Sequence, residues 1–197
     1  MLTKQSKIAI VGCGGLGSNA ASNLVRAGFT NLLIIDFDVV NESNLNRQFY
    51  FQDQIGKRKT DAIKENLSRI SDKVKIQCLF EKINEINISD HLSDAEVVIE
   101  CVDNASAKSL IVQYALNQGK IIIAASGVCE TCVEYPIKVE KKLNGFYLIG
   151  DGITDIAKGN QPFSAKVSAV AAYQADIMIS LLSIYDSNKH PQKMHSL

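Results

Sequence analysis

The sequence of 197 residues has no excess of charge, because 21 basic side chains balance 21 acidic ones. Proteins that bind a nucleic acid backbone normally concentrate basic charge on one face, so this balance argues against a nucleic acid ligand. The sequence also lacks an uninterrupted apolar run of 18 residues, and its first 30 residues lack the basic start and apolar stretch of a signal peptide. We therefore expect a cytoplasmic protein with no membrane partner.

Histidine is scarce, and this limits the catalytic chemistry. Of three histidines, His190 and His195 lie near the end of the sequence and His91 lies in a polar segment. A histidine acid for hydride transfer, or a Ser-His or Cys-His relay, is therefore hard to build. Five cysteines, an odd number, are spread through apolar segments, and we expect no structural disulfide.

What is present is a hydrophobic content of 46%, enough for a buried core at this length. Short, almost continuously apolar runs alternate with segments of helical periodicity, which is typical of strands buried on both faces of a parallel sheet. The predicted strands are 7–11, 31–36, 74–80, 96–101 and 120–125, and the predicted helices between them are 16–27, 58–70 and 105–117.

After Gly127 the pattern changes. Short strands at 133–139 and 146–149, separated by a charged turn, predict that the sheet gains antiparallel strands. A polar loop at 150–162 is long enough to be functional, and it leads into a long helix of small and apolar residues at 165–185.

We therefore predict an α/β fold, Rossmann-like, with a mostly parallel sheet and antiparallel C-terminal strands. Residues 1–185 are expected to form a single domain, followed by a polar tail at 186–197.

A glycine turn follows the first predicted strand directly. Gly12, Gly14 and Gly17 form the pattern G-x-G-x-x-G, and Asp36 ends the next strand. Such glycines let the backbone approach phosphates at a helix N-terminus, while the acid binds ribose hydroxyls. This context predicts a nucleotide site. An NAD-linked oxidoreductase would carry the same glycine motif and acid, although few residues remain in this sequence for a substrate domain.

Polar residues follow the carboxyl ends of the predicted strands. Open α/β folds keep their ligands at that edge of the sheet, so these residues are expected to converge. They offer cations for phosphates, amides for orientation and a carboxylate for Mg²⁺, which suits chemistry on a nucleoside triphosphate. The residues are Asp38, Asn44, Arg47, Gln48, Lys59 and Asp103.

Together these motifs resemble the ThiF/MoeB family of ubiquitin-activating-enzyme-like adenylyltransferases. The resemblance covers about residues 7 to 128 and is carried by Gly12-x-Gly14-Gly15-Leu16-Gly17-Ser18, Asp36-Phe37-Asp38, Ser43-Asn44-Leu45-Asn46-Arg47-Gln48, Gly56-x-x-Lys59 and Asp103-Asn104. The runs 146–152 and 164–167 resemble short ThiF-type members.

The resemblance implies that ATP binds along the glycine turn, with Asp36 on the ribose and Asp103 on Mg²⁺ as a catalytic residue. It further implies that Asn44, Arg47 and Lys59 surround the phosphates, with Arg47 and Lys59 catalytic and Gln48 in support. The implied reaction adenylates the C-terminal glycine of a ubiquitin-like sulfur carrier protein, ThiS-like and serving thiamine biosynthesis, and releases pyrophosphate. A homodimer is also implied.

Some features depart from the family. Larger members carry two C-x-x-C zinc pairs, whereas this sequence has only Cys129 and Cys132 at that spacing, so we expect no structural zinc and leave the role of the pair open. Only six residues precede the first predicted strand, so we expect the family's trans arginine to be absent. Three alternatives stay open: a small-molecule carboxylic acid as acceptor, an NAD-binding oxidoreductase, and a non-catalytic scaffold subunit.

Overall fold

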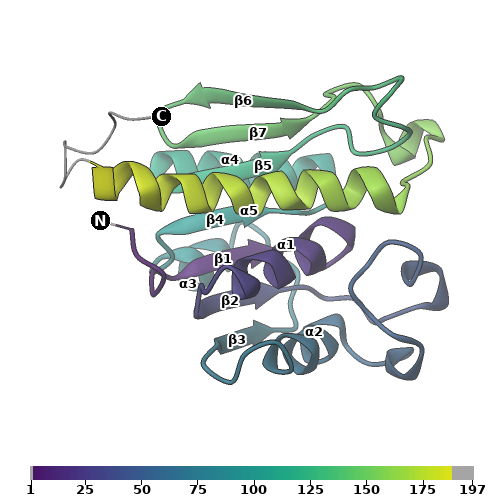
Figure 1. Cartoon of the computed structure of the whole chain (residues 1–197), viewed down its shortest axis with the longest axis horizontal. Coiled ribbons are helices and arrows are strands. Elements are labelled where there is room, and N and C mark those ends of the chain that lie inside the picture. Colours follow the sequence, from purple (N-terminus) through teal and green to yellow (C-terminus); the bar gives the residue numbers. More distant parts are fainter. Residues whose placement is uncertain (1, 188–197) are drawn as a thin grey trace, which may run out of the picture.

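The computed structural model describes residues 2–187 and contains a seven-stranded sheet flanked by helices (Figure 1). The strand order is β3-β2-β1-β4-β5-β7-β6, and every neighbouring pair is parallel except β6 with β7. The predicted fold class is confirmed. The strands are β1 (Ile8–Val11), β2 (Asn31–Ile35), β3 (Lys75–Leu79), β4 (Val97–Glu100), β5 (Ile121–Ala125), β6 (Lys138–Leu143) and β7 (Phe146–Gly150).

Alternate residues of the buried strands face opposite sides of the sheet, and helices cover both sides. The helices that cover one face are α1 (Gly15–Arg26), α2 (Lys59–Ser68) and α5 (Ser164–Ser187), and those that cover the other are α3 (Ile88–Leu92) and α4 (Ala105–Asn117) (Figure 1). In β1, for example, Ile8 and Ile10 join the core beneath α1, while Ala9 and Val11 join the core beneath α4. This burial on both faces explains the continuously apolar strands.

Two local predictions were wrong. The strand expected at 133–139 begins instead at Lys138 and runs through the charged segment that we predicted to be a turn. Every residue of β6 is exposed, because it lies at the edge of the sheet, where charged side chains reach water. The short helix α3 was not predicted. It is anchored by only two buried residues, Ile88 and Leu92, in an otherwise polar segment.

Helix α5 packs against α1 and the sheet. By length and mean hydropathy alone its segment Ser164–Leu182 could cross a membrane, but half of that segment is buried inside the molecule, as in the core helix of a folded domain. Helix α5 continues to Ser187, two residues past the predicted end of the helix at 185. The rest of that tail, 188–197, lies outside the described residues.

Candidate functional site

A pocket of about 270 Å³ lies at the carboxyl ends of β1, β2 and β4. In this sheet the chain leaves β1 toward β2 on one side and reaches β4 on the other, and such a switch point is where open α/β sheets bind ligands. The predicted site residues on its wall are Gly12, Gly14, Gly15, Leu16, Asp36, Asp38, Asn44, Arg47, Gln48, Lys59 and Asp103. Gly17 does not line the pocket and lies within the first turn of α1.

The buried carboxylate of Asp36 ties the end of β2 to the glycine turn. Its Oδ2 accepts a hydrogen bond from the backbone N–H of Cys13 at 2.5 Å, and its Oδ1 accepts one from the N–H of Asp38 at 2.7 Å. Burial raises the pKa of Asp36 above its usual value, and this effect exceeds the opposing effect of those two hydrogen bonds. Each carboxylate oxygen keeps a second lone pair, which could accept a ribose hydroxyl.

Lys59 begins α2 and is only 5% exposed, so it is not a solvated first-turn lysine. Its Nζ lies 2.8 Å from Oδ2 of Asp38, and its backbone N–H donates to the carbonyl oxygen of Asp38 at 2.9 Å. The ammonium is therefore held at the pocket wall by a carboxylate that is itself half exposed. An anionic ligand in the pocket would compete with Asp38 for this cation.

The loop between β2 and α2 brings Arg47 and Gln48 to the pocket. Nη1 of Arg47 donates to the carbonyl of Ser43 at 3.1 Å and to Oδ1 of Asn46 at 2.8 Å. Among the side chains of the described residues, Oε1 of Gln48 is a buried oxygen with no hydrogen-bond partner. A buried acceptor left unpaired costs about 1–3 kcal/mol, so a polar ligand that reached it would relieve a penalty.

Residues that the sequence did not single out hold this loop in place. Asn66 of α2 and Gln54 exchange two hydrogen bonds, at 2.8 and 3.0 Å, and Asn66 also donates to the carbonyl of Phe49. The hydroxyl of Tyr50 donates to the carbonyl of Cys13 at 2.7 Å. The sequence carries no signal for these residues, because buried amides are uncommon and nothing in the sequence shows that these are buried.

Asp103 follows β4 and is exposed at the pocket mouth. The residue that caps α4 is its neighbour Asn104, whose Oδ1 accepts from the N–H of Ala107 at 3.0 Å. The turn before Asp103 is fixed by the buried Glu100, which pairs with Lys108 at 2.5 Å and accepts from the N–H of Val102. Asp103 is therefore free of a capping role, so its carboxylate is available to a ligand.

No group of three or more His, Cys, Asp or Glu side chains within residues 2–187 could hold a metal ion. Any cation at Asp103 would thus need ligands from a bound molecule, such as phosphate oxygens, which suits Mg²⁺. All five cysteines are free thiols; Cys129 is buried and Cys132 is exposed.

Part of the pocket lining is apolar, in contrast to the cations Arg47 and Lys59. Four of its lining residues come from the last third of the described chain: Val128, Ile156, Pro162 and Val167. We call this set the apolar wall. Two of its members belong to the loop at 150–162, which the sequence indicated as functional without indicating these side chains.

A second pocket of about 230 Å³ adjoins the first. The two pockets share Gly12, Asp36, Phe37, Val102 and Asp103. The second pocket adds the apolar side chains of Val11, Ile35, Ile83 and Ala107 and the polar ones of Glu81, Lys82 and Asn104. A ligand that contacts Asp36 could therefore place one part in each pocket.

Comparisons with known proteins find relatives of this chain. A sequence model of the ThiF family matches residues 2–196. The chain is 35% identical, over 67% of its length, to ubiquitin-like modifier-activating enzyme 5 of Dictyostelium discoideum. It is 34% identical, over 64% of its length, to the adenylyltransferase and sulfurtransferase UBA4 of Eremothecium gossypii. It spans only 38% and 28% of the lengths of these two relatives.

The fold also matches solved structures. The AMP complex of Escherichia coli tRNA N6-threonylcarbamoyladenosine dehydratase, TcdA, superposes with a TM-score of 0.79 at 19% identity, over 91% of this chain and 88% of that one. The Escherichia coli MccB complex with ATP gives a TM-score of 0.73 at 22% identity, over 92% and 57%. At these identities the likeness concerns the fold alone.

Proposed function

The chain belongs to the ThiF family, and from that membership we propose that it is an adenylyltransferase acting on a carboxylate with Mg²⁺ and ATP. One observation carries the proposal: the ribose acid Asp36, the cations Arg47 and Lys59, and the carboxylate of Asp103 all border one pocket beside the N-terminus of α1. We further propose that residues 1–185 act as one catalytic domain and that the protein works in the cytoplasm.

The two adjoining pockets suggest how ATP would lie. Asp36, on the wall that they share, would bind the ribose, and the more apolar second pocket would take the adenine base. The phosphates would then lie in the first pocket, against the unpaired N–H groups of the first turn of α1 and beside Lys59, Asn44 and Arg47. The unpaired Oε1 of Gln48 would accept a hydrogen bond from the bound nucleotide or from a water molecule of its hydration shell.

In the proposed reaction an acceptor carboxylate oxygen attacks the α-phosphorus of ATP. A new P–O bond forms to the acceptor, and the bond between the α-phosphorus and the oxygen that bridges the α- and β-phosphates breaks. Pyrophosphate leaves with the bonding electrons. Arg47 and Lys59 would stabilise the charge that develops on the phosphate oxygens, and they would do so in a partly buried pocket where such interactions are strong. Mg²⁺, held by Asp103 and phosphate oxygens, would add neutralising charge.

We propose the C-terminal glycine of a ubiquitin-like sulfur carrier, ThiS-like and serving thiamine biosynthesis, as the acceptor. The names of the curated relatives support a ubiquitin-like acceptor in general. The apolar wall also suits a glycine tail, since a chain without side chains can lie flat along it. A small carboxylic acid is the competing acceptor. A purely scaffolding subunit is disfavoured, because it would not need Arg47, Lys59 and Asp103 at one pocket.

Carrier-AMP formation tests this acceptor. Purified protein, ATP and Mg²⁺ are incubated with each candidate carrier, and the intact mass of the carrier is measured. We expect an AMP adduct on a carrier that ends in glycine and none on the same carrier lacking its last glycine. The carboxylate of the shortened tail would not reach the α-phosphorus of ATP. Pyrophosphate exchange driven by a small carboxylic acid, with every carrier inert, would contradict the acceptor and spare the reaction class.

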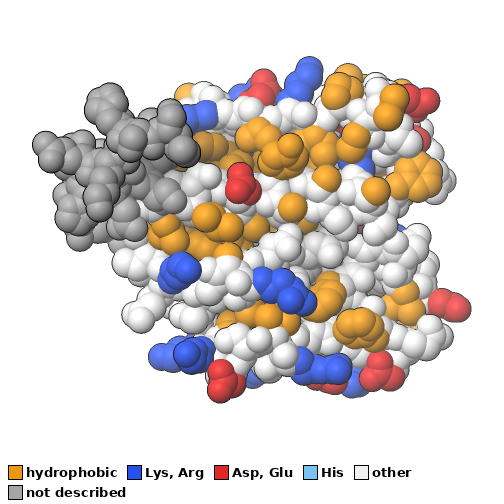
Figure 2. Space-filling view, viewed as in Figure 1, with side chains coloured by type: hydrophobic (Ala, Val, Ile, Leu, Met, Phe, Trp, Pro, Cys, Tyr) orange, Lys and Arg blue, Asp and Glu red, His pale blue; other side chains and the backbone are white. Residues whose placement is uncertain are grey.

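We also propose a homodimer formed through α5. Figure 2 shows hydrophobic side chains gathered along this helix, and a groove of about 530 Å³ lies between α1 and α5. Ala172 and the partly exposed Tyr173 line it together with Asn23 of α1.

Replacing Ala172 by arginine should shift the protein from dimer to monomer, because a charge would be buried in the contact. Light scattering across a concentration series measures the mass. Lys57→Ala, an exposed change outside the lining of the groove, is the control and should leave the dimer intact. A monomeric parent protein at all concentrations would contradict the proposal.

A further inference from the structure

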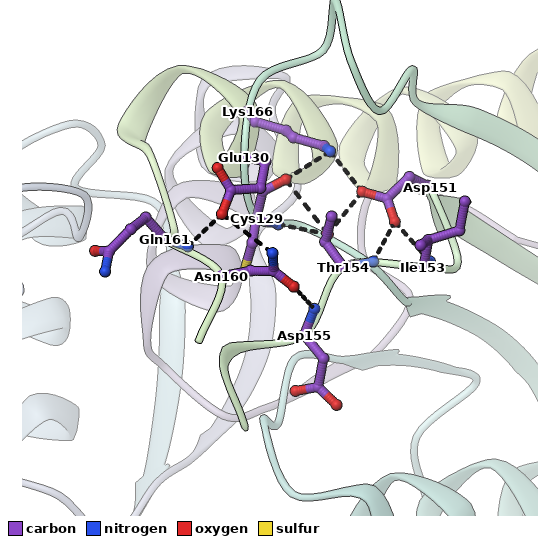
Figure 3. A network of polar contacts seen from close by, with 9 residues as sticks. All are labelled: Cys129, Glu130, Asp151, Ile153, Thr154, Asp155, Asn160, Gln161 and Lys166. Carbon is purple, nitrogen blue, oxygen red and sulfur yellow. Dashed lines mark hydrogen bonds and ion pairs between the residues drawn. The ribbon is translucent and has the colours of Figure 1, made fainter. Parts of the chain in front are cut away.

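A buried ion pair joins Lys166 to Asp151 (Figure 3). Nζ of Lys166 is 2.5 Å from Oδ2 of Asp151, and both side chains are only 1% exposed. Lys166 belongs to the first turn of α5, so its position is fixed by a long helix. Burying two charges stabilises a fold little, since the loss of hydration offsets their attraction. Folding stability alone therefore does not explain this pair.

Lys166 joins two segments that are far apart in sequence. Besides Asp151, which follows β7, its Nζ donates to the carbonyl oxygen of Cys129, in the segment that follows β5, at 2.6 Å. Thr154 makes the same connection in parallel, because its hydroxyl donates to Oδ2 of Asp151 at 2.7 Å and accepts from the N–H of Cys129 at 3.1 Å. Figure 3 shows these side chains meeting at one point.

The segments are joined a second time further along. Oε1 of Glu130 accepts from the backbone N–H of Gln161 at 2.8 Å and from the amide of Asn160 at 3.2 Å. The backbone N–H of Glu130 donates in turn to the carbonyl of Gln161. The loop at 150–162 is thus attached to the segment after β5 at both of its ends.

The residues next to these attachment points form the apolar wall. Val128 precedes Cys129, Val167 follows Lys166, and Ile156 and Pro162 lie within the attached loop. Neither Asp151 nor Lys166 lines the pocket itself. The pair can therefore influence the pocket only through the position of the wall.

The charged residues of the pocket are held by other bonds. Asp36 is fixed by the N–H of Cys13, Lys59 by Asp38, and the Arg47 loop by Asn66. None of these hydrogen bonds involves the attached loop or α5. A change in the ion pair should therefore displace the apolar wall while leaving intact the hydrogen bonds that hold Asp36, Lys59 and the Arg47 loop.

We propose that the Asp151–Lys166 pair positions the apolar wall and thereby sets the affinity for the acceptor tail, while leaving the affinity for ATP unchanged. This inference rests on the proposed function, which places the acceptor along that wall. Both residues are positioning residues, because neither touches the reacting atoms.

The test compares two constants in the same variants. Lys166→Met removes both hydrogen bonds of the ammonium, and Thr154→Val removes the parallel connection without unpairing a buried charge. We expect Lys166→Met to raise the KM for the carrier by about 10- to 100-fold, since small misplacements at a reacting group have effects of this size. ATP binding, measured by calorimetry without carrier, should stay within about twofold, as expected for sites held independently. Thr154→Val should shift the same KM by a smaller factor.

A double variant separates positioning from stability. Asp151→Asn together with Lys166→Met leaves no buried charge unpaired. The double variant should therefore have a higher melting temperature than Lys166→Met alone, close to that of the parent protein. The carrier KM should nevertheless stay raised, because methionine cannot bind the carbonyl of Cys129. If stability and KM recover together, the role is merely structural. Lys7→Met, which breaks an ion pair to Asp94 at the far end of the sheet, is the matched control and should change neither constant.

The outcomes distinguish the two proposals. If the parent protein adenylates the carrier but the variants keep its KM, or raise the Kd for ATP equally, positioning by this pair is wrong. If Lys166→Met does not fold, Thr154→Val decides the matter alone. A parent protein that adenylates no carrier would instead contradict the proposed acceptor, on which this inference depends.

Discussion

Replacing either Arg47 or Asp103 by alanine should lower the rate of ATP–pyrophosphate exchange by about 10²- to 10³-fold, the usual effect of removing one group that stabilises charge in a transition state. Arg47 faces the pocket from the loop after β2, and Asp103 from the turn after β4. Neither is needed for folding: both are at least partly exposed, and the hydrogen bonds of the Arg47 side chain stay within its own loop. The melting temperature should therefore stay close to that of the parent protein.

Two exposed residues provide matched controls. Arg69 ends α2 and Asp72 lies in the following turn, both outside the pocket lining. Arg69→Ala and Asp72→Ala should exchange pyrophosphate at the parent rate. Exchange at the parent rate by Arg47→Ala or Asp103→Ala would show that the nucleotide site has been placed wrongly.

Replacing Gly17 by alanine should lower the free energy of unfolding by about 3 kcal/mol or more, at the upper end of what overpacking costs. A Cβ atom at Gly17 would lie 1.9 Å from the carbonyl oxygen of Gly12. That backbone cannot move away easily, because Gly12 has a φ of +91° and itself lies close to the carbonyl of Cys101. Gly17 thus supports the pocket from below by letting α1 approach β1. Urea denaturation of both proteins measures the difference.

Gly14→Ala is the control for this effect. Gly14 has a φ of −78°, and the nearest atom to an added Cβ is 3.7 Å away. We expect a loss of about 1 kcal/mol, the cost of alanine at a helix N-cap. Equal losses at the two positions would mean that steric crowding under the helix does not explain the glycine pattern.

The central strands could be predicted from sequence to within one or two residues, because burial on both faces leaves a continuous apolar run. The same rule fails at β6, whose lysines and glutamate belong to an exposed edge, and at α3, whose two buried residues form no stripe. Edge strands and single-turn helices depend on neighbours that the local sequence does not specify.

The charged residues of the site and its apolar wall differ in how far the sequence predicts them. Asp36, Lys59 and Asp103 were predictable because each belongs to a motif at a strand end, a position that topology brings to one edge of the sheet. The apolar wall was not predictable, because Val128 or Ile156 looks like any core residue in sequence. The Asp151–Lys166 pair escaped for another reason: nothing in the spacing of the two residues indicates that they meet.

The position of β1 between β2 and β4 has a consequence for how the protein folds. β1 pairs with β2 through a short connection, but Lys7, just before β1, meets Glu96, just before β4, across 89 residues. Contacts so distant in sequence close late and slow the search for the native state. On the ribosome the glycine turn is made early, yet it can form no pocket until β4 emerges. We therefore expect nucleotide to slow unfolding of the finished protein without accelerating its folding.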